Sequence, residues 1–424
     1  NPPVHGWATW KVYEIDREQN NGVGDIAFLE KIFHKLLLNF TWWINQKDDT
    51  GNNIFSGGFL GLDNIGVFDR STPMPFGGKL QQADATGWMA MFTLNMLRIS
   101  VEISLAHPVY QDMSSKFFEH FLHIAGAMES VGGSSSSISL WDEEDQFYYD
   151  VINIPNGQNI LLKVRSIVGL IPLFAVELLD PAILDKMPVF KRRVEWVLAN
   201  RPDLARLVSR WYESGKGENR LLSILRGHRM KMIMKRVLDE GEFLSEFGVR
   251  ALSKFHKDHP YKFYINGEVL QVDYTPGEAL TNIMGGNSNW RGPIWFPLNY
   301  LIFDSLIKFH DYYGEDFMVE YPTNSGNLCT IKDAAMGLAD RLIHIFKKDA
   351  LGNRAFNGAD EKLQKDENFS EHILFYEYFH GDNGRGCGAS HQTGWTGLVA
   401  ELILKTSQEA NTKKIKETSI LNLD

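Results

Sequence analysis

The sequence predicts an all-α fold, arranged as a toroid of six helical hairpins, an (α/α)6 barrel. Two observations favour it. Apolar residues return every three or four positions through about ten segments, which is the pattern of amphipathic helices. Long loops rich in Trp, Tyr, Asp, Asn and Gly separate some of these segments, and a toroid would gather such loops on one face. These loops are 49–83, 132–161, 257–292 and 351–392. A helical solenoid is the competing architecture, but it would show a repeat of fixed period.

Segment 25–46 shows the helical pattern clearly, because Leu29, Phe33 and Phe40 fall on one face. Further helices are expected at 84–106, 112–130, 162–179, 184–200, 218–237, 243–256, 293–313, 331–347 and 393–407. Within the loop 257–292, the pair Asn266-Gly267 predicts a tight β-hairpin turn. No break in composition divides the chain. Residues 1–405 are therefore expected to form one domain, followed by a polar tail at 406–424.

Composition limits the classes of partner. The 424 residues carry a formal net charge of −10, which argues against nucleic acid and anionic membranes. No apolar run of about eighteen residues is present, so no transmembrane helix is expected. Two cysteines, Cys329 and Cys387, are too few for a disulfide framework or a zinc site, and a reducing compartment follows by default. With no signal peptide, the expected location is the cytoplasm. No metal or other cofactor is predicted, and the oligomeric state is left open.

Three loops combine glycines with side chains suited to chemistry, and they are 58–73, 285–300 and 375–396. Their candidate residues are Asp63, Asp69, Trp290, Arg291, Trp295, Glu377, Gln392 and Trp395. Trp rings offer flat faces for sugar rings, and glycines let a backbone approach a ligand closely. Two carboxylates in separate loops suit glycoside hydrolysis, in which one protonates the leaving oxygen and the other activates water. No Walker loop, GxSxG elbow or HExxH motif is present.

Each candidate also has an ordinary structural interpretation. Asp63 precedes Asn64 and suits a turn, while Asp69 beside Arg70 suits an ion pair or a cap. Single Trp residues are more often core than ligand platforms. Taken together, the residues favour a carbohydrate-active helical protein.

Several segments, taken in order, resemble motifs of one family. They are NPPVHGWA, GLDN, QADATGWMAMFTLNML, WDEEDQFYYD, KVRSIVGLIPLFA, FLSEFGVRALSK, NWRGPIWFPLNYL and YEYF followed by GASHQTGWT. Over residues 1–405 the chain resembles glycoside hydrolase family 63, the family of processing α-glucosidase I and its bacterial relatives. The resemblance implies an (α/α)6 barrel that hydrolyses an α-glycosidic bond with inversion, in an oligosaccharide or a small α-glycoside.

Carried over motif by motif, the resemblance assigns Asp63 as the general acid and Glu377 as the general base. It places five further residues at or near the sugar-binding cleft, namely Trp290, Arg291, Trp295, Gln392 and Trp395. Asp69 has no catalytic counterpart. The family's earlier Trp-Asp motif and first helices do not precede NPPVHGWA in this chain, so the barrel is expected to lack them. NIGVFDRS follows GLD in place of the family's shorter run, so a different subsite specificity is expected.

Two alternatives remain open. One is another enzyme on the same toroid. An epimerase would need a histidine pair at the pocket floor, and a phosphorylase would need a phosphate site beside the base; a lyase belongs to the same group. The other is a non-catalytic sugar-binding protein with an incomplete barrel. The sequence names neither the sugar nor the linkage.

Overall fold

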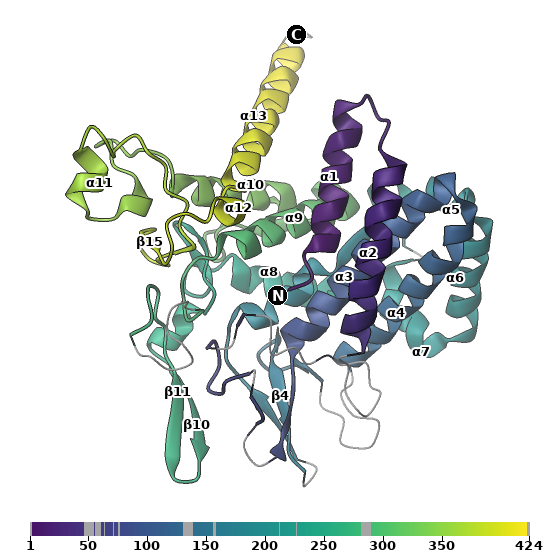
Figure 1. Ribbon diagram of the computed structural model, residues 1–424, viewed down its shortest axis with the longest axis horizontal. Coiled ribbons are helices and arrows are strands. Elements are labelled where there is room, and N and C mark those ends of the chain that lie inside the picture. Colours follow the sequence, from purple (N-terminus) through teal and green to yellow (C-terminus); the bar gives the residue numbers. More distant parts are fainter. Residues whose placement is uncertain are drawn as a thin grey trace. The chain divides into compact units, whose positions relative to one another are not determined.

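A computed structural model gives the fold of the chain (Figure 1). It describes residues 2–45, 55, 61–62, 64–70, 72–74, 77–129, 139–155, 158–211, 213–225, 227–280 and 290–421. The chain forms two compact units. Unit 1 comprises Asn1–Ile233 and Asp311–Gly314, and unit 2 comprises Met234–His310 and Glu315–Asp424. Helices α8 and α9 each cross the boundary between them.

Unit 1 is built around one buried helix, α3. Its helices are α1 (His5–Gln19), α2 (Ile26–Ile44), α3 (Ala83–Ala106), α4 (Gln111–Glu129), α5 (Pro181–Asp185), α6 (Pro188–Asn200), α7 (Pro202–Ala205) and α8 (Gly227–Val237). Helices α1, α2 and α4 all pack against α3 (Figure 1). Nearly all residues of α3 are buried, as in a helix covered on every side. Among the described helices only α3 is long and apolar enough to span a membrane, and 83% of its most apolar window is buried in unit 1.

Small antiparallel sheets complete unit 1. Its strands are β1 (Lys79–Gln81), β2 (Trp141–Asp142), β3 (Phe147–Tyr148), β4 (Asp150–Asn153), β5 (Asn159–Leu162), β6 (Val176–Leu179) and β7 (Arg220–Ser223). They pair as β1-β4-β5, β2-β3 and β6-β7. Strand β1 leads directly into α3, and its partner β4 begins at Asp150. This pairing brings the Asp150 carboxylate to the α3 N-terminus, where it accepts from the Ala83 N–H at 2.9 Å.

A buried ion cluster joins Asp150 to the loop that precedes β1. Both terminal nitrogens of Arg70 donate to the Asp84 carboxylate, and its Nη2 lies 3.0 Å from Asp150 Oδ2. The side chains of Arg70 and Asp84 are 5% and 0% exposed. Arg70, which follows Asp69 in the sequence, therefore pairs with two other aspartates. Arg70 fastens its loop to α3.

Asp150 makes stability depend on pH. Burial raises its pKa from 3.8 to about 6; Arg70 opposes this shift and Asp84 adds to it. Between these two values the folded chain keeps a proton that the unfolded chain has lost, so this group's contribution to the free energy of unfolding falls as pH rises from about 4 to 6 and is constant above. Asp150→Asn removes that dependence. Urea unfolding across this range should show the variant gaining stability relative to the wild type with rising pH. A difference that is constant with pH would contradict this assignment.

Unit 2 combines long helices with two-stranded sheets. Its helices are α9 (Phe296–Tyr313), α10 (Ile331–His344), α11 (Glu361–Lys365), α12 (Thr393–Thr396) and α13 (Val399–Leu421). Its strands are β8 (Leu244–Ser245), β9 (Gly248–Val249), β10 (Tyr261–Ile265), β11 (Glu268–Val272), β12 (Met318–Glu320), β13 (Leu328–Thr330), β14 (Tyr378–Phe379) and β15 (Gly386–Cys387). Thr330 and Asp333 form a capping box that starts α10, and α10 packs against α13. Helix α13 continues to Leu421, through most of the polar tail.

The expected hairpin turn is confirmed. Asn266 and Gly267 have φ values of 48° and 84° and join β10 to β11, which project as a ribbon in Figure 1. Two consecutive residues with positive φ match the right-handed twist of the flanking strands, and Asn-Gly tolerates this conformation well.

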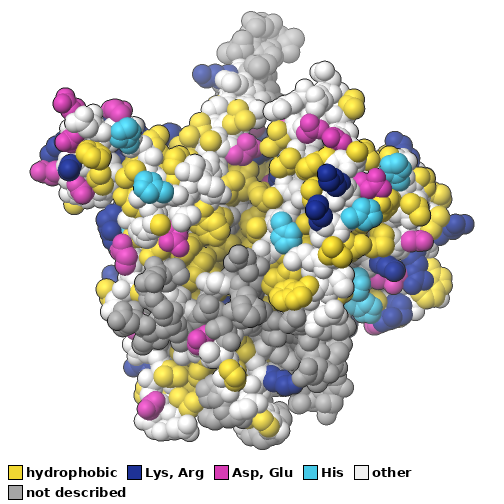
Figure 2. All heavy atoms as spheres, in the orientation of Figure 1, with side chains coloured by type: hydrophobic (Ala, Val, Ile, Leu, Met, Phe, Trp, Pro, Cys, Tyr) yellow, Lys and Arg dark blue, Asp and Glu magenta, His cyan; other side chains and the backbone are white. Residues whose placement is uncertain are grey.

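On the described part of the face in Figure 2, acidic and basic side chains are interspersed.

A mostly helical chain is confirmed, but the all-α prediction is too simple because short antiparallel strands are present. The helix expected at 162–179 is wrong, since this apolar segment forms 3-10 turns and β6. Pro172 cannot continue a helix, and Gly169 lies too close to Phe147 for any larger residue. The helix expected at 243–256 is also wrong; Gly248, with φ +132°, sits in the β8-β9 hairpin. Helix α1 was not predicted.

Candidate functional site

The proposed acid, Asp63, lies outside the described residues. The residues on either side of it are described, and both are buried, with Leu62 2% and Asn64 8% exposed. Three apolar residues further along the loop are also buried: Ile65, Val67 and Phe68. These five described residues are therefore packed in the protein rather than solvated. Arg70 ties the end of this loop to α3 through Asp84.

The proposed base, Glu377, stands immediately before β14. Its backbone N–H donates to Ala389 O at 2.8 Å, and the Ala389 N–H reaches Glu377 Oε2 at 3.4 Å. The side chain is half-buried. Gly388 leaves room for the carboxylate, because an added Cβ would lie 2.7 Å from Glu377 Oε2. Its φ of +68° also favours glycine at this position. A carboxylate held in this way can accept a proton from a water molecule.

An aromatic cluster lies next to Glu377. Trp290 stacks on Trp295 with ring centroids 3.8 Å apart, and Trp295 stacks on Tyr378 at 4.8 Å. Trp395 meets Trp295 edge-on at 6.2 Å and donates from Nε1 to the Glu377 carbonyl at 3.0 Å. Trp290 and Trp295 are buried, whereas Trp395 is 38% exposed. Trp395 is therefore the most exposed ring of this cluster.

Backbone pairing joins the two loops that carry these residues. Ile294 and Phe379 exchange hydrogen bonds of 2.8 and 2.9 Å, and the Ala251 N–H donates to Pro293 O at 2.9 Å. Gly292, with φ +143°, and Gly381 pack so closely that a Cβ on Gly381 would lie 2.4 Å from Gly292 O. The segments 290–295 and 377–381 thus form one body within unit 2.

Arg291 and Gln392 occupy different surroundings. Burial lowers the pKa of the Arg291 guanidinium, an effect that Asp273 opposes. Gln392 is exposed at the start of α12, and its N–H donates to Phe375 O at 2.7 Å. Trp290 and Trp295 thus lie in one stack, and Trp395 contacts both Trp295 and the Glu377 backbone. Arg291 follows Trp290 in the chain, and the Gln392 carbonyl accepts from the Trp395 N–H at 2.9 Å.

Some residues of this site were missed by sequence reasoning. Tyr378 completes the aromatic stack, and Thr396 Oγ1 donates to Tyr376 O at 2.6 Å, which anchors α12 on the segment that carries Glu377. The run FYEYF around Glu377 was a possible signal for Tyr378, since successive residues of a strand point to opposite faces. Among the residues that the structure describes, no group of three His, Cys, Asp or Glu side chains is placed to hold a metal ion.

Comparison with known proteins finds partial matches to two glucosidases. No family model matches the chain. Residues of the chain match the mannosyl-oligosaccharide glucosidase of Saccharomyces cerevisiae at 28% identity and the probable one of Schizosaccharomyces pombe at 26%. Each match covers 41% of this chain and 15% of the relative. These partial matches support a family like glycoside hydrolase family 63, in agreement with the resemblance drawn from the motifs.

Over most of its length the chain is similar to an uncharacterized protein of Saccharomyces cerevisiae, YMR196W, with 49% identity over 415 residues. That match covers 95% of this chain and 38% of the relative. The chain therefore spans well under half the length of each of these relatives. A solved structure of a family 63 mannosylglycerate hydrolase from Thermus thermophilus, in complex with glucose, aligns with a TM-score of 0.45 and 17% identity, covering 95% of this chain and 75% of that one.

Proposed function

We propose that this chain is the catalytic part of an inverting glycoside hydrolase that cleaves α-glycosidic bonds. One observation carries the proposal: Glu377 is held beside a cluster of tryptophans, one of them exposed, in a chain related to glucosidases. Glycoside hydrolysis needs a carboxylate of this kind, and nearby aromatic rings suit a sugar-binding surface. The mannosyl-oligosaccharide glucosidases named above make an α-glucoside the first substrate class to test.

The proposed mechanism is a single displacement. Asp63, protonated, donates to the glycosidic oxygen as that bond breaks. Glu377, ionised, takes a proton from the water that attacks the anomeric carbon on the opposite face. Inversion needs the two carboxyls roughly 6.5–9.5 Å apart, so that this water fits between Glu377 and the sugar. Trp395 would support the sugar ring, and Arg291 and Gln392 would donate to its hydroxyls.

The same proposal includes the architecture around the site. Residues 1–405 would contribute to an (α/α)6 toroid whose long loops form the active-site face. Trp290 and Trp295 would form the wall behind the base. The cytoplasm is the proposed location.

The acid role of Asp63 is tested by changing the leaving group. Asp63→Asn should lower kcat for α-linked disaccharides by about 10²- to 10⁴-fold, because an alkoxide leaves poorly without a proton. The loss should be far smaller for 4-nitrophenyl α-glycosides, since nitrophenolate leaves without protonation. Initial rates on glucosides and mannosides of both kinds measure the two losses.

Asp69→Asn is the matched control, because it makes the same change in the same loop at a residue with no proposed catalytic role. It should keep wild-type rates on both kinds of substrate. Equal losses for Asp63→Asn on both would remove Asp63 from the acid role. If the wild type binds these sugars but hydrolyses none, a sugar-binding protein replaces the enzyme.

A further inference from the structure

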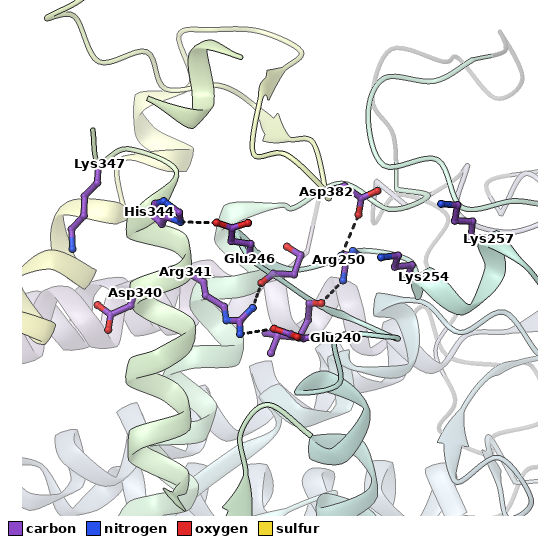
Figure 3. Close-up of a pocket in the computed structure, with 12 residues that line it drawn as sticks. Glu240, Glu246, Arg250, Lys254, Lys257, Asp340, Arg341, His344, Lys347 and Asp382 are labelled. Carbon is purple, nitrogen blue, oxygen red and sulfur yellow. Dashed lines mark hydrogen bonds and ion pairs between the residues drawn. The ribbon is translucent and has the colours of Figure 1, made fainter. Parts of the chain in front are cut away.

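Three side chains from separate segments of unit 2 form a closed hydrogen-bonded network. Asp382 Oδ1 accepts from Tyr274 Oη at 2.7 Å and from Arg250 Nη2 at 3.1 Å. Arg250 Nε donates to the same Tyr274 oxygen at 2.8 Å, and Arg250 Nη1 donates to Leu244 O. Each member therefore bonds to the other two. Figure 3 shows Arg250 and Asp382 pointing toward each other across one end of a pocket.

The network is charged and partly buried. The Arg250 side chain is 6% exposed and that of Asp382 is 38% exposed. Burial would raise the pKa of Asp382, but the hydrogen bond from Tyr274 and the charge of Arg250 outweigh it and hold the pKa below its ordinary value. Burial raises the pKa of Tyr274, so its hydroxyl stays protonated and donates. At neutral pH the network thus pairs a buried guanidinium with an ionised carboxylate through a neutral phenol.

The pocket beside this network has a volume of about 840 Å³. Its two arginines are already committed to the protein. Arg250 bonds within the network, and Arg341 donates to Tyr321 Oη, Ser245 O and Glu240 Oε1. Figure 3 shows the Arg341 guanidinium directed at Glu240. Both arginines therefore hold segments of unit 2 together.

Asp382 lies in the loop 380–385, which joins β14 to β15, and Glu377 stands directly before β14. Each of these strands has two residues, so their ladder alone fixes the hairpin weakly. Further bonds tie the loop to the segment 274–278. The Gly381 N–H donates to Pro276 O at 2.7 Å, and Arg385 pairs with Glu278 at 2.6 Å. Backbone bonds to Ile294 and Pro276 and side-chain ties from Asp382 and Arg385 thus place this hairpin together.

We propose that Tyr274 and Asp382, anchored on the buried Arg250, are positioning residues for Glu377. They touch no reacting atom in this account. They hold the β14-β15 hairpin against the segments at 250 and 274–278, and the carboxylate at its start keeps its place beside the tryptophans. The catalytic consequence of this positioning rests on the proposed function.

The test uses Tyr274→Phe, which keeps the ring and removes only the hydroxyl, and Asp382→Asn, which keeps the shape and removes the charge. Tyr264→Phe is the matched control, because Tyr264 is 74% exposed on β10. Hydrogen exchange measured by mass spectrometry on the 424-residue chain should be faster in peptides covering 375–389 in both variants. The control should match the wild type. Peptides of α3 in unit 1 should be unchanged.

Kinetics supply the second readout. A base displaced by a fraction of an ångström or more should lower kcat about 10- to 100-fold while KM changes little, because the sugar contacts remain. Exchange at 375–389 equal to that of the wild type in both variants would overturn the inference, as would equally faster exchange throughout the chain. Local loosening with unchanged kcat, in an active wild type, would overturn the positioning of Glu377. A wild type without hydrolytic activity would remove the proposed function alone, and the exchange result would still decide whether the network holds the hairpin.

Discussion

Glu377→Gln is expected to lower kcat by about 10²- to 10⁴-fold on every glycoside that the wild type cleaves. Glutamine keeps the size of the side chain, but its amide cannot take a proton from water. The loss should be the same for disaccharides and 4-nitrophenyl glycosides, since activation of water does not depend on the leaving group. KM should stay close to the wild-type value, because Trp395 and the other sugar contacts are retained. Steady-state kinetics on both kinds of substrate measure this.

Glu371→Gln is the matched control, six residues earlier in the same loop. Glu371 pairs with Lys348 at 2.6 Å and its side chain is 72% exposed. This variant should keep wild-type kcat. If Glu377→Gln is as active as Glu371→Gln, Glu377 is not the base. If it loses activity only toward disaccharides, Glu377 is acting as the acid.

The second large effect is on stability. Arg70→Met should lower the free energy of unfolding by about 3–5 kcal/mol, because it leaves the buried carboxylates of Asp84 and Asp150 without their cation. Methionine fills most of the space of the arginine stem, so the loss of charge dominates. Urea unfolding at pH 7, followed by far-ultraviolet circular dichroism, gives the value.

Arg201→Met tests whether burial is the cause. Arg201 pairs with Asp203 at 2.7 Å, but both side chains are about half exposed, at 44% and 56%. Its removal should change stability little, because water screens an exposed pair. Similar losses for the two variants would contradict a special role for the buried cluster.

The Arg70→Met variant should also lose activity, since Arg70 ties down the loop that carries Asp63.

Local signals account for the parts of the fold that the sequence predicted. Helices such as α2 and α10 follow from apolar spacing, and the Asn266-Gly267 turn follows from the conformational needs of a two-residue hairpin. The helix predicted at 162–179 was wrong because a short buried apolar run has the same sequence pattern in a helix, a strand or a 3-10 turn. Its outcome is set by packing, as at Gly169 against Phe147.

The candidate site also has residues that local motifs predicted and contacts that they did not. Glu377 and the tryptophans could be proposed from motifs that lie close to them in the sequence. The partners of Arg70 could not, because Asp84 and Asp150 reach it only after α3 and β4 have packed. The network of Arg250, Tyr274 and Asp382 is a tertiary contact between segments 24 and 132 residues apart. No local pattern reports such contacts, and a single sequence gives no other view of them.

The most direct test of the central claim is the anomer first released. Proton NMR, started within seconds of adding the chain to an α-glucoside or α-mannoside that it cleaves, should show the β-anomer before mutarotation restores the equilibrium mixture. That result follows from a water activated by Glu377 on the face opposite the leaving group. Release of the α-anomer first would contradict inversion, and with it the assignment of Glu377 as a base acting through water.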